Sequence, residues 1–285
     1  MAEFFVALGN PDVPFVRFAL IAGLLASPAF GMIGTYVTVN RISYVAGGIA
    51  HATLGGIGAA LYVQAQHESH WFTPLFGALA AAVLGALIIG AVSMYARERE
   101  DSVIGAVWAV GMAVGLLFIA RAPGYVDPAS YLFGSILLLS KGNLITIVVL
   151  DLVVLVTGVL FYRQLEALSF DEEFARVRGI NTGLLYMLLV ILIAVGIVLL
   201  TLIVGIILVI ALLTIPPAIA SMFARTLWAV MLLGAVLTAL FSTIGMAASY
   251  AWDFPSGATI IVVAGGAYLL LSAGRAALRG RLRGS

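Results

Sequence analysis

The sequence contains no cysteine, which excludes a disulfide framework, a thiolate metal site and a thiol nucleophile. Charge is also scarce, because only 9% of the 285 residues are charged whereas 63% are hydrophobic. Such a composition is not that of a soluble globular domain. The start of the sequence has neither a basic segment nor an evident small-residue cleavage site, so we expect no removable signal peptide.

Apolar runs of 18 residues or more recur along the sequence, as in helices that cross a membrane. The run Leu184–Leu213 is apolar on every side, whereas the strands of a membrane barrel would alternate between apolar and polar residues. We therefore predict an all-α protein, a polytopic transmembrane helix bundle of about nine spans, with eight or ten as alternatives. The expected spans are 14–39, 45–65, 74–95, 103–120, 143–162, 182–202, 204–222, 227–250 and 257–274.

Two segments leave this count open. The stretch 182–222 is long enough for two spans and must contain a hairpin. The segment 129–140 is too short to cross a bilayer, which takes about 20 residues, so we expect it to be re-entrant or interfacial. We also expect Pro216 and Pro217 to break or end a helix, because proline removes a hydrogen-bond donor and clashes with the preceding turn.

The 31 glycines are spread through the expected spans, often at helix-packing spacing. Small residues allow helix backbones to approach closely in lipid, so a tightly packed bundle is one interpretation. A helix that slides or tilts during translocation is the other. Examples are Gly47, Gly48, Gly55, Gly56, Gly58, Gly111 and Gly115.

The distribution of arginine predicts the orientation, because short cytoplasmic loops are enriched in Lys and Arg. An N-terminus outside the cell places most arginines, including those of the C-terminal tail, in the cytoplasm. We therefore expect the chain in a cytoplasmic membrane with a cytoplasmic C-terminus. The cytoplasmic set is Arg41, Arg97, Arg99, Arg163, Arg176, Arg178, Arg225 and the four arginines between 275 and 283.

Two ionisable residues fall inside expected spans. His51 follows Arg41 by about ten residues, which places it roughly 15 Å into the bilayer. It is either part of a metal or translocation path or a neutral imidazole hydrogen-bonded to a neighbouring helix. Asp151 occupies the centre of an apolar run, where a charge costs about 2.5–3.5 kcal/mol. It is either a protonated or hydrogen-bonded structural residue or an ion or proton site.

Two further candidates lie on expected outer loops. His67 and His70 flank Glu68 and could form a weak site for a divalent ion, the alternative being two solvated loop histidines. Asp253 closes the eighth expected span beside a Pro-Ser-Gly turn. It either caps that turn or guards an entrance to the translocation path.

A polar island, Ser169–Asn181 with the sequence SFDEEFARVRGIN, separates two long apolar runs. Phe170, Phe174 and Val177 recur at helical spacing, and the acidic residues precede the arginines, as the helix dipole favours. We expect a short interfacial helix that ends at Gly179. A solvated amphipathic loop is the alternative.

This island resembles the cytoplasmic coupling segment of the permease subunits of ABC importers for zinc, manganese and iron, in which a stretch similar to SFDPEFARALGI follows the middle spans. Three further stretches agree in the same order. Residues 31–58 resemble the second-helix region of the family, 132–137 is a local match, and 253–263 resembles its last helix. The matching island residues are Phe170, Asp171, Glu173, Phe174, Ala175, Arg176, Gly179 and Ile180.

The resemblance implies a type II ABC importer fold with one permease domain over residues 1–285 and a coupling segment at 169–181. It implies a homodimer with the translocation path at the subunit interface, in a prokaryotic cytoplasmic membrane. Two cytoplasmic ATPase subunits would dock on the coupling segments, and an extracytoplasmic binding protein would deliver the metal. On this resemblance the metal would be cargo, and we expect no permanently bound cofactor. We expect no nucleic-acid partner.

No enzymatic activity is expected of the chain itself. Lys141 is not preceded by a GxxxxG frame, so the chain has no phosphate-binding loop of its own and ATP would be hydrolysed by the partner. An intramembrane enzyme is not favoured, because a buried His and a buried Asp come without a nucleophile or paired carboxylates. The alternative function is an ion- or proton-coupled secondary transporter that uses Asp151, although no inverted repeat is evident.

The sequence departs from the family pattern near the second-helix His. Many members carry an Asp four residues before the second-helix His and are thought to line the metal path with it, whereas this chain has Gly47. One helical turn separates the two positions, so a hard oxygen ligand is lost from the face that carries His51. Asp151 or Asp253 could compensate, or the substrate could differ. Imidazole alone suits zinc, iron, nickel and copper.

Overall fold

The computed structural model describes residues 4, 8, 14–67, 71–95, 99–123, 128–133 and 141–283, in which helix is the only regular secondary structure. The all-α architecture is therefore confirmed. Nine helices coincide with the nine expected ranges, and the last of them continues through the arginines of the tail. The helices are α2 (Pro14–Val39), α3 (Ser43–His67), α4 (Pro74–Tyr95), α5 (Glu100–Arg121), α6 (Pro128–Phe133), α7 (Lys141–Leu160), α8 (Tyr162–Phe170), α9 (Glu172–Val177), α10 (Thr182–Val204), α11 (Ile206–Phe223), α12 (Leu227–Trp252) and α13 (Ser256–Arg283).

The expected count of nine spans is not confirmed. Seven of the described helices are long and apolar enough to cross a membrane, and α7 with α8 makes an eighth if this pair is one span. The two helices of the pair meet at an angle of 69°. By the same criteria, the stretch Thr182–Val198 of α10 counts as a shorter apolar helix.

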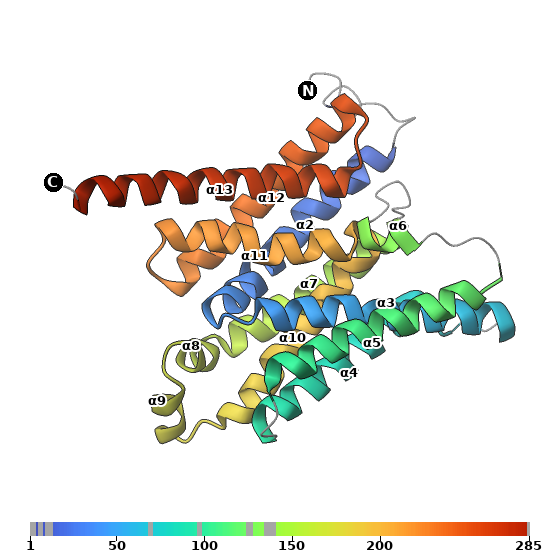
Figure 1. Ribbon diagram of the computed structural model, residues 1–285, viewed down its shortest axis with the longest axis horizontal. Coiled ribbons are helices and arrows are strands. Elements are labelled where there is room, and N and C mark those ends of the chain that lie inside the picture. Colours follow the sequence, from blue (N-terminus) through green and yellow to red (C-terminus); the bar gives the residue numbers. More distant parts are fainter. Residues whose placement is uncertain are drawn as a thin grey trace.

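The helix ends gather at two sides of the bundle (Figure 1). α8 and α9 lie at the lower left, on the side where α2, α4 and α11 end, whereas α12 passes into α13 at the upper right. The α2–α3 and α11–α12 connections, which contain Arg41 and Arg225, are therefore on the same side as α9. This arrangement agrees with the prediction that Arg41 and Arg225 lie on the same side of the membrane.

α3 is the most enclosed of the candidate spans and packs against both α4 and α5. Glycine makes these contacts close, because a Cβ on Gly55 would lie 2.9 Å from the carbonyl oxygen of Gly111. A Cβ on Gly56 would overlap the carbonyl oxygen of Gly77 on α4. These positions therefore serve tight backbone packing, the first of the two interpretations of the glycine pattern.

The stretch 182–222, in which we expected a hairpin, forms two helices separated by a single residue. Gly205 separates α10 from α11 and has φ 86°, a left-handed conformation that favours glycine. The two helices leave this residue in different directions (Figure 1).

The expectation that Pro216 and Pro217 end a helix was wrong, since both lie inside α11. The hydroxyl of Thr214 donates to the Ile210 carbonyl at 2.8 Å, so it does not serve the carbonyls left free by the prolines. One of those, Leu213 O, lies against Gly34 of α2, where a Cβ would be 2.5 Å away. Close packing by α2 therefore supports the helix through its prolines.

α6 is the described part of the segment expected to be re-entrant or interfacial, 129–140. It covers Pro128–Phe133, and the rest of the segment lies outside the described residues. Six residues are too few to cross a membrane, as expected.

Candidate functional site

His51 lies on α3 and is buried, with 9% of its surface exposed. Its Nδ1 is 2.9 Å from the carbonyl oxygen of Gly47, one turn earlier. A carbonyl oxygen only accepts, so Nδ1 carries the proton and donates it. The hydrogen bond thus stays within α3, in contrast to the expected alternative of a bond to a neighbouring helix. Nε2 keeps its lone pair in this tautomer and is the atom that could bind a metal ion.

Trp108 of α5 stacks on His51, and sequence analysis missed it. The ring centroids are 4.1 Å apart and the planes are inclined by 18°. A tryptophan inside an expected span resembles any other apolar or lipid-facing residue, so the sequence holds no signal for this contact. Only the packing of α5 on α3 brings the two rings together.

Asp151 lies on α7, is 6% exposed, and has a buried Oδ1 without a hydrogen-bond partner. Ile147 and Val154, one turn to either side, are also buried, whereas Leu152 and Leu160 are exposed. Asp151 therefore belongs to the face of α7 that packs on α2 and α10, and it points away from lipid. This placement agrees with the expectation that it faces protein. Whether it is structural or an ion or proton site stays a prediction.

Asp253 is the C-cap of α12 and is exposed, with a left-handed backbone at φ 53°. The backbone N–H groups of Asp253 and Phe254 both donate to the carbonyl of Ser249, which closes the end of the helix. The structure therefore places Asp253 in a capping turn, as one of the two interpretations expected. A role for its side chain at an entrance stays a prediction.

The expected outer-loop pair falls at the edge of the described chain. α3 ends at His67, and His70 lies outside the described residues, as does Glu68 between them. Within the described ranges, no group of three or more His, Asp or Glu side chains is placed to hold a metal ion. His51, Asp151 and Asp253 therefore do not form one cluster in this structure.

The polar island is not a single helix, which corrects the expectation from its spacing. α8 ends at Phe170, and a new helix, α9, begins at Glu172. Asp171 has an extended backbone, and its Oδ1 accepts from the N–H of Phe174 at 2.8 Å. An N-cap that satisfies a free N–H starts a helix, and the side-chain spacing alone does not reveal this break.

α9 otherwise has the expected features. Glu172 and Glu173 occupy its first turn and Arg176 its last turn, as the helix dipole favours. It ends before Gly179, which has φ 79° and favours glycine. The Ile180 N–H donates back to the carbonyl of Ala175 at 3.1 Å. The ending at Gly179 is therefore confirmed.

The island has one buried anchor and an exposed apolar surface. Ala175 is fully buried, whereas Phe170 is 66%, Phe174 51% and Val177 83% exposed. The guanidinium of Arg178 lies 5.0 Å from the centroid of the Phe174 ring, a cation–π contact. Large apolar side chains exposed on a polar segment are typical of a surface that meets a partner.

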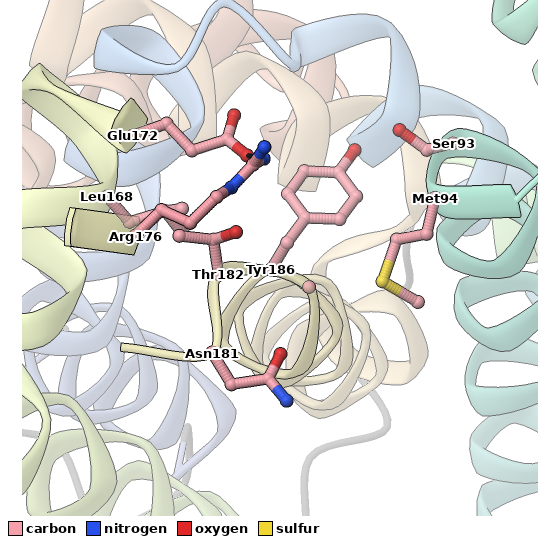
Figure 2. A pocket seen from close by; sticks show the side chains of 9 residues that line it. Ser93, Met94, Leu168, Glu172, Arg176, Asn181, Thr182 and Tyr186 are labelled. Carbon is pink, nitrogen blue, oxygen red and sulfur yellow. Dashed lines mark hydrogen bonds and ion pairs between the residues drawn. The ribbon is translucent and has the colours of Figure 1, made fainter. Parts of the chain in front are cut away.

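A cavity of about 450 Å³ lies between α9 and the ends of α4, α8 and α10. Figure 2 shows Tyr186 rising from α10 between the Glu172–Arg176 ion pair and Ser93 of α4. The Tyr186 hydroxyl donates to Glu100 Oε1 of α5 at 3.2 Å. The cavity is lined by Ser93, Met94, Leu168, Glu172, Arg176, Asn181, Thr182, Gly183 and Tyr186.

A polar contact joins the island to the end of α2. Asn40, just after α2, donates from Nδ2 to the Ser169 hydroxyl at 3.0 Å and to the Tyr36 carbonyl at 2.8 Å. The Ser169 hydroxyl donates to the Leu165 carbonyl within α8. Asn40 therefore links α2 to the segment that precedes α9. Sequence analysis missed it, because it is 129 residues from its partner.

A model of the ABC 3 transport family matches residues 12–275 of the sequence. The chain belongs to this family. The resemblance based on the polar island and the three other stretches is therefore confirmed.

Named relatives of the chain cover most of its length. A "Probable metal transport system membrane protein" of Chlamydia pneumoniae is 39% identical, over 87% of this chain and 85% of the relative. The manganese transport system membrane protein MntC of Halalkalibacterium halodurans is 32% identical, over 88% of this chain and 84% of the relative. A chain of PsaBC from Streptococcus pneumoniae, solved in complex with Fab, superposes with a TM-score of 0.83 at 26% identity, covering 94% of both chains.

Proposed function

We propose that this chain is the permease subunit of an ABC importer that moves a divalent transition metal ion across a prokaryotic cytoplasmic membrane by alternating access. The named relatives are metal and manganese transport proteins, and the chain matches them over most of their length. The proposal includes one permease domain over residues 1–285, a type II importer fold with nine spans, a second copy of the chain and an extracytoplasmic binding protein. ATP hydrolysis is assigned to a separate subunit.

The observation that carries the proposal is the exposed apolar surface of the polar island. Phe174 and Val177 on the short capped helix α9 and Phe170 at the end of α8 are exposed. α9 lies at the side of the bundle where α2, α4 and α11 end (Figure 1). Arg41 and Arg225 are in connections on this side, which supports a cytoplasmic location for it under the positive-inside rule. We therefore assign α9 as the docking element for the ATPase.

Two connections join the coupling segment to the rest of the bundle. Four residues separate α9 from α10, and Asn181 caps α10 by accepting at Oδ1 from the Leu184 N–H at 3.0 Å. The other connection is the Asn40–Ser169 hydrogen bond, which joins α8 to α2. Closure of the ATPases would bias a two-state bundle through these contacts, so that the ion site faces first outward and then inward.

The proposed metal path includes His51, with Asp151 and Asp253 as further polar groups along it. His51 offers Nε2 as a nitrogen ligand, and neutral imidazole suits borderline divalent ions. His67 and His70 are proposed as outer contacts before entry. The proton-coupled alternative through Asp151 is not favoured, since the chain belongs to the ABC 3 transport family.

Co-purification of the tagged chain from its native membrane tests the proposal. We expect stoichiometric recovery of an ATPase subunit, and elemental analysis should detect a transition metal in the complex. Phe174→Ala should lower ATPase recovery. Phe254→Ala is the matched control, because Phe254 is 57% exposed and follows α12 at the opposite side of the bundle (Figure 1). Recovery of the chain alone, or equal recovery with both variants, would contradict the docking assignment.

A further inference from the structure

Trp108 is half-buried and packs on three residues of one face of α3. Its ring centroid lies 4.1 Å from that of His51 and 5.9 Å from that of Tyr44, while Gly47 lies between these two positions in the sequence. Residues at this spacing share a helix face. The indole thus lies over Gly47 with an aromatic ring on either side.

Gly47 allows the indole to lie this close to α3. A Cβ at this position would lie 3.1 Å from Cζ3 of Trp108 and 3.6 Å from Cη2, so even alanine would push on the indole. The same residue provides the carbonyl that accepts from Nδ1 of His51. One glycine therefore both leaves room for the indole and holds the imidazole.

Neighbouring glycines fix the two helices that carry these rings. A Cβ on Gly58 of α3 would lie 2.5 Å from the carbonyl oxygen of Gly115 of α5, and Gly55 meets Gly111 in the same way. Such close backbone contact leaves α5 little freedom to slide along α3. The stacked rings are therefore held by a rigid pair of helices, which is the condition for a well-oriented ligand.

Two constraints then determine which atom of His51 meets the ion. The bond to Gly47 fixes the tautomer and leaves Nε2 unprotonated, while the stack on Trp108 prevents the ring from turning about its axis. We propose that Trp108 is a positioning residue that holds His51 with Nε2 as the coordinating atom for a borderline divalent cation such as Zn²⁺. This inference rests on the proposed function, because it requires His51 to be in the metal path.

Fluorescence of Trp108 gives a direct test with the full chain in lipid nanodiscs. Trp71, Trp228 and Trp252 are exposed and can be replaced by phenylalanine, which leaves Trp108 as the sole tryptophan. Addition of Zn²⁺ should change its emission with a saturable dependence, because the ion binds the ring stacked on the indole. His51→Ala should abolish the change. Saturable zinc binding measured by dialysis without a change in Trp108 emission would overturn the proposal.

Affinity measurements test the positioning role. Trp108→Ala should weaken Zn²⁺ binding, measured by equilibrium dialysis, by about 2- to 10-fold, the worth of an aromatic pair, and Trp108→Phe should restore part of it. Gly47→Ala should weaken binding as well, but add little to Trp108→Ala. Gly266→Ala is the matched control, because nothing lies within 4 Å of a Cβ there.

The variants also separate this proposal from the proposed function. If His51→Ala abolishes ATP-driven zinc uptake by the reconstituted complex while Trp108→Ala leaves zinc affinity unchanged, the positioning role is wrong and the metal path stands. If neither variant changes uptake, the path does not pass through His51 and both assignments fail.

Discussion

Asp171→Ala removes the cap of α9 and is expected to uncouple ATP hydrolysis from transport. The side chain accepts from the Phe174 N–H at 2.8 Å, and loss of such a cap costs about 0.5–2 kcal/mol. This corresponds to about a 2- to 30-fold fall in the ratio of formed to unfolded α9. A helix of six residues has little stability of its own, so the cap carries a large share of it.

The surrounding contacts compensate little for this loss. The Glu172–Arg176 ion pair is 2.8 Å long, but both side chains are more than half exposed, and such pairs contribute about 0–1 kcal/mol. Asp171→Asn is the matched control, because asparagine keeps an acceptor oxygen and caps about equally well.

The assay is ATP-driven zinc uptake and ATPase activity of the complex reconstituted in liposomes. We expect uptake with Asp171→Ala to fall several-fold while basal ATPase activity persists, and Asp171→Asn to remain close to the unsubstituted complex. Equal losses with both variants would show that the charge contacts the partner and that the cap is not the cause. Unchanged uptake with Asp171→Ala would refute the reasoning.

Three further predictions concern glycine and the buried carboxylate. Gly179→Ala should destabilise the end of α9 by about 1–2 kcal/mol, because φ is 79°, and faster hydrogen exchange at the α9 amides would reveal it. Gly56→Ala should lower the free energy of unfolding by about 1–3 kcal/mol or more, seen as a lower unfolding temperature in detergent, because its Cβ would overlap Gly77, whereas Gly266→Ala should not. Asp151→Asn should lower ATP-driven uptake without abolishing it, because the amide keeps one oxygen of a polar group that we place along the metal path and the account assigns no proton relay; uptake driven by a pH gradient without the ATPase, and lost in this variant, would support the secondary-transporter alternative.

Helix positions could be predicted from the sequence, because the ends of each apolar run mark the approximate ends of a helix. The nine expected ranges fall on nine helices, and even the continuous stretch around Gly205 was divided within a few residues. The effect of Pro216 and Pro217 could not be predicted, since what supports α11 there is the close approach of α2, which no local rule describes. The number of spans depends on how α7, α8 and α10 lie in lipid, and helix length alone does not fix it.

The features of the candidate site that could be predicted are those determined by residues nearby in the sequence. The end of α9 at Gly179 and the burial of His51 and Asp151 follow from their own neighbours in sequence. Trp108 was missed because its partner is on another helix, and the break at Asp171 because capping competes with the helical spacing around it. Contacts between distant segments require the three-dimensional packing.

Metal accumulation by liposomes that contain the chain tests the central claim most directly. The chain is reconstituted with and without the ATPase that co-purifies with it, and zinc and manganese entering the lumen are measured. We predict accumulation that requires both the ATPase and ATP, and that Phe174→Ala but not Phe254→Ala reduces. Accumulation driven by a pH gradient in liposomes that contain this chain alone would contradict the account.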